Sequence, residues 1–285
     1  MTSGDYIQRK LRAWAERKGI QLQGSAGTRG ERNYTMSVEK NIFGGEIHPS
    51  VRASFEAGAG GELEGPIPTM SALHSSSALA VNLFQYWVVR GELGEIAKLL
   101  EVPSGGIKAG EFEDMFPVSA TPEAGGFKVP PHLDFAMRYA DGSVVGVECK
   151  LFEPFGRLGH GPLKPAYLKL KDAWGDIPEC LALAERLAVG NAGFHRLGAS
   201  QLLKHILGLR FQARNAKMRL IYLYYDAIGQ EAAEHAQEIR EFQKLIARDP
   251  ISFVPLSVQG FILRAIRGVR GNHVAYVDYL AERYL

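Results

Sequence analysis

Apolar side chains recur along this chain at two spacings, one typical of helices and one typical of strands. Residues 144–152 are the most strand-like run, because β-branched and apolar side chains dominate them. Strands are also predicted at 111–119 and 132–140, and Asp141-Gly142 predicts a hairpin turn after the second of these strands. Further strands are expected at 219–225 and 251–258. Helices are expected at 5–18, 78–89, 92–100, 166–173, 179–189, 200–211, 232–247 and through most of 259–285.

The order of these elements predicts an α/β protein. Three consecutive strands followed by a crossover helix and a further strand favour a mixed β-sheet flanked by helices on both faces. Residues 24–68 are rich in Gly, Ser and Pro, which predicts an irregular, poorly packed arm. We therefore divide the chain into an N-terminal extension (1–68), with a basic helix and the Gly-rich arm, and a single domain (69–285) with C-terminal additions.

Composition narrows the class of protein. The chain has 285 residues, 46% of them hydrophobic, which is enough to bury a sizeable core. Its net charge of +2 argues neither for nor against nucleic acid. Cys149 and Cys180 are too few for a disulfide framework, which favours a reducing, cytoplasmic location. Neither a secretory signal nor an apolar stretch of about 18 residues is visible, so we expect no membrane contact.

One cluster of charged residues interrupts the apolar strands. Glu148 and Lys150 are two residues apart and share a strand face, and the hairpin brings Asp134 opposite them. Buried charges are unfavourable unless they are paired or hold a metal. Two carboxylates suit Mg²⁺, with Mn²⁺ as an alternative, and Lys150 would orient or deprotonate a water. The competing interpretation is a structural ion pair on a solvated sheet face.

The residues of this cluster resemble a known group of nucleases. Pro131 to Asp134, followed by Glu148-Cys149-Lys150, is similar to the motif of the PD-(D/E)XK nuclease superfamily, although the proline does not directly precede Asp134. The resemblance covers about residues 71–227 and implies a restriction-endonuclease-like α-β-β-β-α-β core. A closer likeness links the chain to bacterial restriction-endonuclease-like proteins. It rests on four short motifs: His74, Ser76, Asn82 and Phe84; Glu148, Lys150 and Glu153 to Phe155; Gln201 to His205; and Tyr222 to Asp226.

The resemblance also implies roles for individual residues. Asp134, Glu148 and the backbone carbonyl of Cys149 would hold the metal, and Lys150 would be the catalytic lysine. Gln201 would point into the site from its helix, or else be an ordinary solvent-facing residue. Supporting positions around the site are Glu153, Asn82, Ser76 and Glu113. For three of these an ordinary alternative remains: helix capping for Ser76, packing for Asn82 and a surface position for Glu153.

A basic segment adjoins the motif. Residues 190–220 contain six Lys or Arg side chains and no acidic one, as phosphate contacts require. The contacts we expect with nucleic acid are Arg196, Lys204, His205, Arg210 and Arg214. The predicted function is a Mg²⁺-dependent nuclease that hydrolyses DNA, either an endonuclease or an exonuclease, in restriction, defence or repair. Double-strand cutting would favour a homodimer. The alternatives are a catalytically inactive nucleic-acid-binding or scaffold protein of the same fold, and an unrelated enzyme with an accidental match.

Overall fold

A five-stranded sheet forms the centre of the protein. The computed structural model describes residues 1–25, 32–58, 61–119, 130–156, 161–190, 192–214 and 216–285. The strands lie in the order β3 (Ile107–Met115), β4 (His132–Tyr139), β5 (Val144–Lys150), β6 (Met218–Tyr224) and β7 (Ser252–Ser257). The first three pair antiparallel, whereas β6 and β7 run parallel to β5. The predicted mixed sheet is therefore confirmed.

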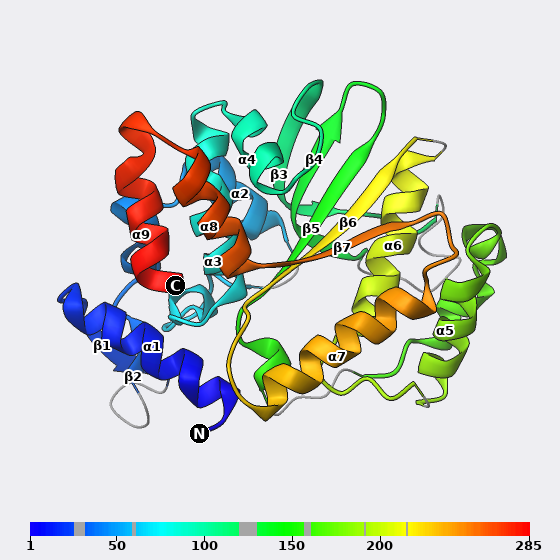
Figure 1. Cartoon of the computed structure of the whole chain (residues 1–285), viewed down its shortest axis with the longest axis horizontal. Coiled ribbons are helices and arrows are strands. Elements are labelled where there is room, and N and C mark those ends of the chain that lie inside the picture. The colour runs from blue at the N-terminus through cyan, green and yellow to red at the C-terminus, as the bar shows by residue number, and fades with distance from the viewer. Residues whose placement is uncertain (26–31, 59–60, 120–129, 157–160, 191, 215) are drawn as a thin grey trace.

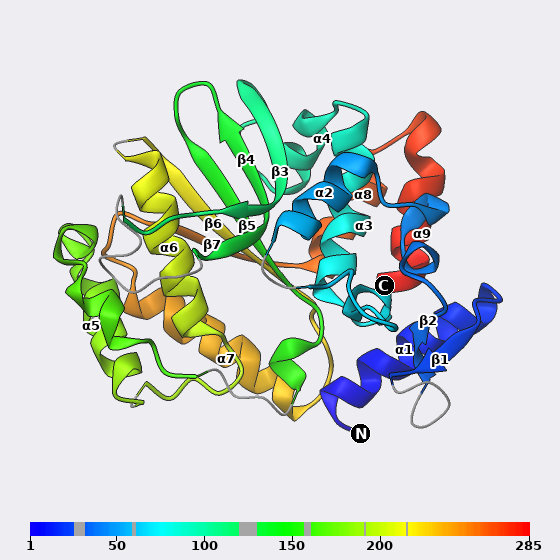
Figure 2. The same ribbon diagram turned by 180° about the vertical axis from the view of Figure 1, so that it is seen from behind.

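Helices cover both faces of this sheet (Figure 1). One face packs against α5 (Pro178–Ala188), α6 (Ala199–Ala213) and α7 (Gln230–Leu245). The other packs against α3 (Ser76–Val89), α8 (Val258–Gly268) and α9 (Val274–Tyr284), with α1 (Ser3–Arg17), α2 (Pro49–Ala57) and α4 (Leu93–Leu99) around them. Figure 2 shows the same two groups of helices from behind. No helix in the described parts of the chain is long and apolar enough to cross a membrane.

Strand β5 lies between β4 and β6, and this position explains its apolar sequence. Val147 and Cys149 belong to the core on the α3 side, and both are fully buried. Gly146 is required on the α6 side, because a Cβ there would come within 2.4 Å of a methyl carbon of Leu133. Glu148 is therefore held on a strand that is covered on both faces.

The N-terminal segment differs from the expected poorly packed arm. Its described residues include the hairpin of β1 (Leu22–Gly24) and β2 (Arg32–Thr35) as well as α2. Within the arm at 24–68, five apolar side chains belong to the core on the α3 side: Val38, Ile42, Ile47, Val51 and Phe55. The Gly and Pro content of the arm predicts turns, but the apolar side chains between those turns pack into the core. Residues 26–31 and 59–60 of the arm, and the turn region 120–129, lie outside the described residues.

Other boundaries shift only slightly. The helix expected at 166–173 is instead two short 3-10 helices, Pro165–Lys169 and Lys171–Trp174, because Leu170 between them leaves the helical region. The first strand begins at Ile107, four residues before the expected start.

The packing of α6 gives a test of this fold. Alanine normally stabilises a helix interior relative to glycine by about 1 kcal/mol. At Gly208, however, a Cβ would lie 2.6 Å from both the Cβ and the carbonyl oxygen of Phe116. We expect Gly208→Ala to lower the free energy of unfolding by about 1–3 kcal/mol. The control is Gly94→Ala in α4, where the nearest atom would lie 3.7 Å away. Urea titrations compare the two, and equal stability of both variants would contradict the close approach.

Candidate active site

A cavity of about 390 Å³ lies at the end of β5 that carries the charged motif. Strands β3, β4 and β5, the start of α3, the start of α6 and the N-terminal segment all contribute side chains to it. Its lining consists of Glu62, Ser76, Ser77, Glu113, Pro131, His132, Asp134, Glu148, Lys150, Glu153, Gln201, Lys204 and His205. All three residues of the predicted catalytic cluster are therefore in one cavity.

The register of the hairpin explains why Asp134 and Glu148 meet. Phe135 pairs with Val147 across β4 and β5, so the next positions outward are Asp134 and Glu148 on a common face. A carboxylate oxygen of Asp134 accepts a hydrogen bond of 2.6 Å from the backbone N–H of Cys149. Lys150 Nζ lies 2.7 Å from Glu148 Oε1. The two carboxylates and the ammonium are thus placed by two adjacent strands.

Neighbouring charges give the two buried carboxyl groups different proton affinities. The Glu148 side chain is 2% exposed and that of Lys150 is 13% exposed. Burial raises the pKa of Glu148, but the attraction of Lys150 and then of His205 outweighs it and lowers the pKa to about 2. Burial, followed by repulsion from Glu148, holds the pKa of Asp134 well above its usual value. Glu148 is therefore an anion at neutral pH, while Asp134 binds a proton more readily than an ordinary aspartate.

Glu113 brings a further carboxyl group to this cavity from β3, next to Asp134 and Glu148. Continuing the pairing of β3 with β4 places it beside Asp134. Its φ of 48° lies in a region that non-glycine residues rarely adopt, and such strain gathers at functional sites. Burial, and then the nearby Glu62 and Glu148, raise the pKa of Glu113 to about 7. Three carboxyl groups crowded in this way favour a cation between them.

Helix α3 anchors the end of β5 through Ser76. Its hydroxyl donates a 2.6 Å hydrogen bond to Glu153 and accepts one of 2.8 Å from the backbone N–H of Leu151. Ser76 is therefore a link between strand and helix, while Ser75 caps the helix. Asn82 does not line the cavity. Its amide instead accepts from the N–H of Phe43 and donates to the carbonyl of Asn41, so it joins α3 to the N-terminal segment.

Helix α6 brings Gln201, Lys204 and His205 to the cavity. His205 is 1% exposed, and its Nε2 lies 3.0 Å from Glu148 Oε2. We expected His205 to contact nucleic acid, but the rotation of the helix buries it against the motif. Lys204 lies at the cavity without an acidic partner among the described residues. Glu62, from the loop after α2, was not anticipated, because only the burial of the N-terminal segment brings it here.

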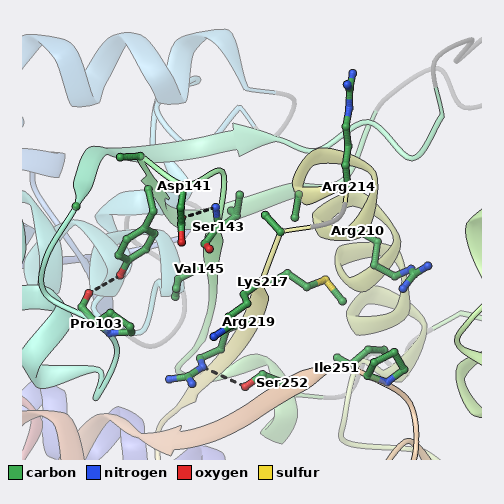
Figure 3. A pocket seen from close by; sticks show the side chains of 18 of the residues that line it. Pro103, Asp141, Ser143, Val145, Arg210, Arg214, Lys217, Arg219, Ile251 and Ser252 are labelled. Carbon is green, nitrogen blue, oxygen red and sulfur yellow. Dashed lines mark hydrogen bonds between the residues drawn. The ribbon is translucent and has the colours of Figure 1, made fainter.

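The remaining basic residues of the segment lie elsewhere. Arg210 and Arg214 line a separate cavity of about 1010 Å³, together with Lys217 and Arg219 (Figure 3). Helix α6 has 15 residues and so spans about 20 Å, which separates its two ends. Arg210 forms an ion pair with Asp176. Figure 3 shows Arg214 pointing away from the other labelled side chains.

Arg196 is also away from the catalytic cluster. It lines a third cavity, at the N-terminus of α1, and lies 3.1 Å from Glu234 of α7. Of the five residues expected to contact nucleic acid, the structure therefore brings only Lys204 and His205 to the cavity of the motif. The pattern of basic residues along the sequence could not separate these positions, because it does not report which end or face of a helix carries each one.

The donors present at the cavity suit a hard metal ion. Among the described residues, no three His, Cys, Asp and Glu side chains form a metal-holding group by themselves. Mg²⁺, however, is usually bound through one or two carboxylates and completes its shell with water and phosphate oxygens. Asp134, Glu148 and the carbonyl of Cys149 supply oxygen donors of this kind. The arrangement therefore fits such an ion in the chemistry of its ligands.

Comparison with known proteins identifies the family of this chain. No curated protein and no solved structure matches the chain. One family model matches residues 8–285, from the first helix to the end of the last. The match includes the N-terminal segment that packs into the core and every residue of the cavity described above. The chain therefore belongs to the family described as "Restriction Endonuclease associating with ARP".

Proposed function

We propose that this protein is a metal-dependent nuclease of the PD-(D/E)XK type that hydrolyses phosphodiester bonds of DNA. The observation that carries the proposal is the convergence of Asp134, Glu148 and Lys150 on one cavity of a restriction-endonuclease family member. The family's description adds an association with ARP. A homodimer would place two such cavities on opposite strands of a duplex.

Each residue of the cluster has a distinct task in this proposal. Asp134 and Glu148, with the carbonyl of Cys149, would hold Mg²⁺ or Mn²⁺. The bound ion would acidify water and offset the charge of the phosphodiester. Lys150 is tied to Glu148, and its ammonium faces the same cavity, where it would orient the attacking water and stabilise developing charge. Gln201 would help to orient the water, and Lys204 would contact a phosphate.

A second candidate function is supported by one observation. Both oxygens of Glu148 already contact a nitrogen atom, one from Lys150 and one from His205. An ion must share those oxygens, so a catalytically inactive protein that only binds nucleic acid is the alternative.

Cleavage by the purified protein separates these two functions. Supercoiled plasmid, linear duplex, single-stranded DNA and RNA are each incubated with Mg²⁺, Mn²⁺ or EDTA. We expect DNA cleavage that needs the metal and that falls to background in Asp134→Ala. The matched control is Asp114→Ala, an aspartate of β3 whose carboxylate pairs with Arg138 and which does not line the cavity. Equal cleavage by wild type and Asp134→Ala would refute the proposal. Binding without cleavage would favour the inactive alternative.

A further inference from the structure

The imidazole of His205 is buried against the carboxylate of Glu148. Its Nε2 lies 3.0 Å from Glu148 Oε2, within ion-pair distance, and the two side chains are 1% and 2% exposed. Neither ring nitrogen has a hydrogen bond of good geometry among the described residues, so the contact with Glu148 is the polar contact found there for this side chain. A histidine kept only for structure would be expected to have both ring nitrogens satisfied. Glu148 is therefore the group that this side chain serves.

Helix α6 holds the imidazole in place. Leu202, Leu203 and Ile206, on either side of His205, belong to the core between α6 and the sheet. Gly208, one turn later, lets the helix approach the backbone of Phe116 closely. The position of Nε2 relative to β5 is thus set by packing along the helix, and the imidazole has little room to turn aside.

Two nitrogen atoms then hold the carboxylate of Glu148, one at each oxygen. Lys150 lies on Oε1 and His205 on Oε2. A carboxylate has about four lone-pair sites, so two donors leave others available for a cation. Loss of a group that hydrogen-bonds a metal-binding side chain typically lowers metal affinity or activity by about 10–100-fold.

We propose that His205 is a positioning residue, which donates from Nε2 to Glu148 and holds its carboxylate in the orientation that binds the divalent ion. In this role it acts through Glu148 and not through a contact with the substrate. This inference rests on the proposed function for the existence of the metal site, and it adds a residue from the crossover helix to the machinery around Glu148.

Mn²⁺ binding tests the role without any reaction. Isothermal titration calorimetry is performed on the wild-type protein and on His205→Leu. This change removes the ring nitrogens and fills the position with an apolar side chain of similar size. We expect the dissociation constant for Mn²⁺ to rise about 10–100-fold in this variant. In His205→Gln, the side-chain amide reaches the position of Nε2, so the affinity should return to within about threefold of wild type. Unchanged affinity in His205→Leu would overturn the inference.

A matched control separates positioning from general loss of packing. His235 of α7 is also 1% exposed, its Nε2 lies 2.9 Å from the hydroxyl of Tyr222, and it is not among the residues that line the cavity of the motif. We expect His235→Leu to lower the melting temperature while leaving the affinity for Mn²⁺ unchanged. A similar loss of affinity in both variants would mean that His205 acts only through packing. If His205→Leu does not fold, the comparison of His205→Gln with His205→Phe decides, and equal affinities there would refute positioning.

The outcome is distinguishable from failure of the proposed function. Wild type that binds Mn²⁺ but cleaves no nucleic acid would remove the proposed activity and leave the role of His205 to be decided by the variants. Wild type that binds no divalent ion would overturn the metal site, and the inference with it. Where cleavage is measurable, we expect His205→Leu to raise the Mn²⁺ concentration needed for half-maximal rate more than it lowers the rate at saturating metal.

Discussion

Replacing Lys150 with methionine is expected to slow metal-dependent DNA cleavage by about 10²–10⁴-fold, the range over which a positioned acid–base group contributes. Lys150 is the cation nearest to Glu148 Oε1, at 2.7 Å, and it faces the cavity in which the scissile phosphate would lie. Methionine keeps the unbranched shape of the side chain, although it lacks the terminal atom, and it removes the charge. The measurement is the single-turnover rate of plasmid cleavage at saturating Mg²⁺ or Mn²⁺.

Loss of the ammonium will also affect stability, so a second variant is needed. Glu148 is 2% exposed, and removing one partner of a buried ion pair typically destabilises a protein by about 3–5 kcal/mol. Lys150→Arg retains a cation beside Glu148 and should unfold near the wild-type temperature. Its guanidinium does not deprotonate, however, and has a different shape, so cleavage should still fall at least about tenfold. Full activity in Lys150→Arg would show that only the charge at this position matters.

Glu113→Gln is expected to stabilise the protein in the absence of metal, and to do so only above acidic pH. Burial and neighbouring carboxyl groups raise the pKa of Glu113 from 4.5 to about 7. A raised carboxyl pKa means that the folded protein binds the proton more tightly than the unfolded chain. The contribution of Glu113 to the stability of the wild type is therefore most favourable below pH 4.5, falls as the pH rises towards 7, and is least favourable above that.

The neutral amide of glutamine does not ionise, so the variant avoids the loss of stability that ionisation of Glu113 causes. The stabilisation by Glu113→Gln should be small below pH 4.5, grow between 4.5 and 7, and level off above 7 at about 2–3 kcal/mol. Urea unfolding in EDTA at several pH values measures it. The control is Glu111→Gln on the same strand, where the carboxylate pairs with Arg138 at 2.8 Å and is 46% exposed. That change should alter stability by less than about 1 kcal/mol. A pH-independent effect at Glu113 would show that its carboxyl group is not crowded.

The expected stabilisation reflects a general conflict between stability and function. Placing Glu113 close to Asp134 and Glu148 in one cavity is unfavourable for the folded chain alone, and a bound cation would relieve the repulsion. The positive φ of Glu113 adds backbone strain at the same point. Stabilising substitutions are commonly found at such sites because selection there has favoured activity over stability.

Most elements of the fold could be predicted from local patterns. The strands follow from runs of apolar and β-branched residues, and the Asp141-Gly142 turn set the hairpin of β4 and β5. The N-terminal segment was the main exception. Local signals for α2 are nevertheless present, because Pro49 stands at its first turn and Val51 and Phe55 are four residues apart on one face. The Gly-rich residues around α2 predict an irregular segment, and this prediction outweighed the local helix signals.

The sequence by itself determined that Asp134 lies near Glu148 and Lys150. Side chains alternate along a strand, so Glu148 and Lys150 share a face, and the turn at Asp141-Gly142 folds the strand of Asp134 back beside them. The exact register was decided by the structure: the N–H of Tyr139 bonds the carbonyl of Ser143, so residues 140–142 form the turn and Asp134 comes opposite Glu148. Only the tertiary structure decided the rest of the cavity. The side of α6 that turns inward depends on how its leucines pack, and this buries His205 against Glu148 while the far end of the helix carries Arg210 and Arg214 to a separate cavity. Glu62 and Ser76 reach the site only because distant segments fold onto the sheet. Such contacts depend on packing between elements, which no local spacing encodes.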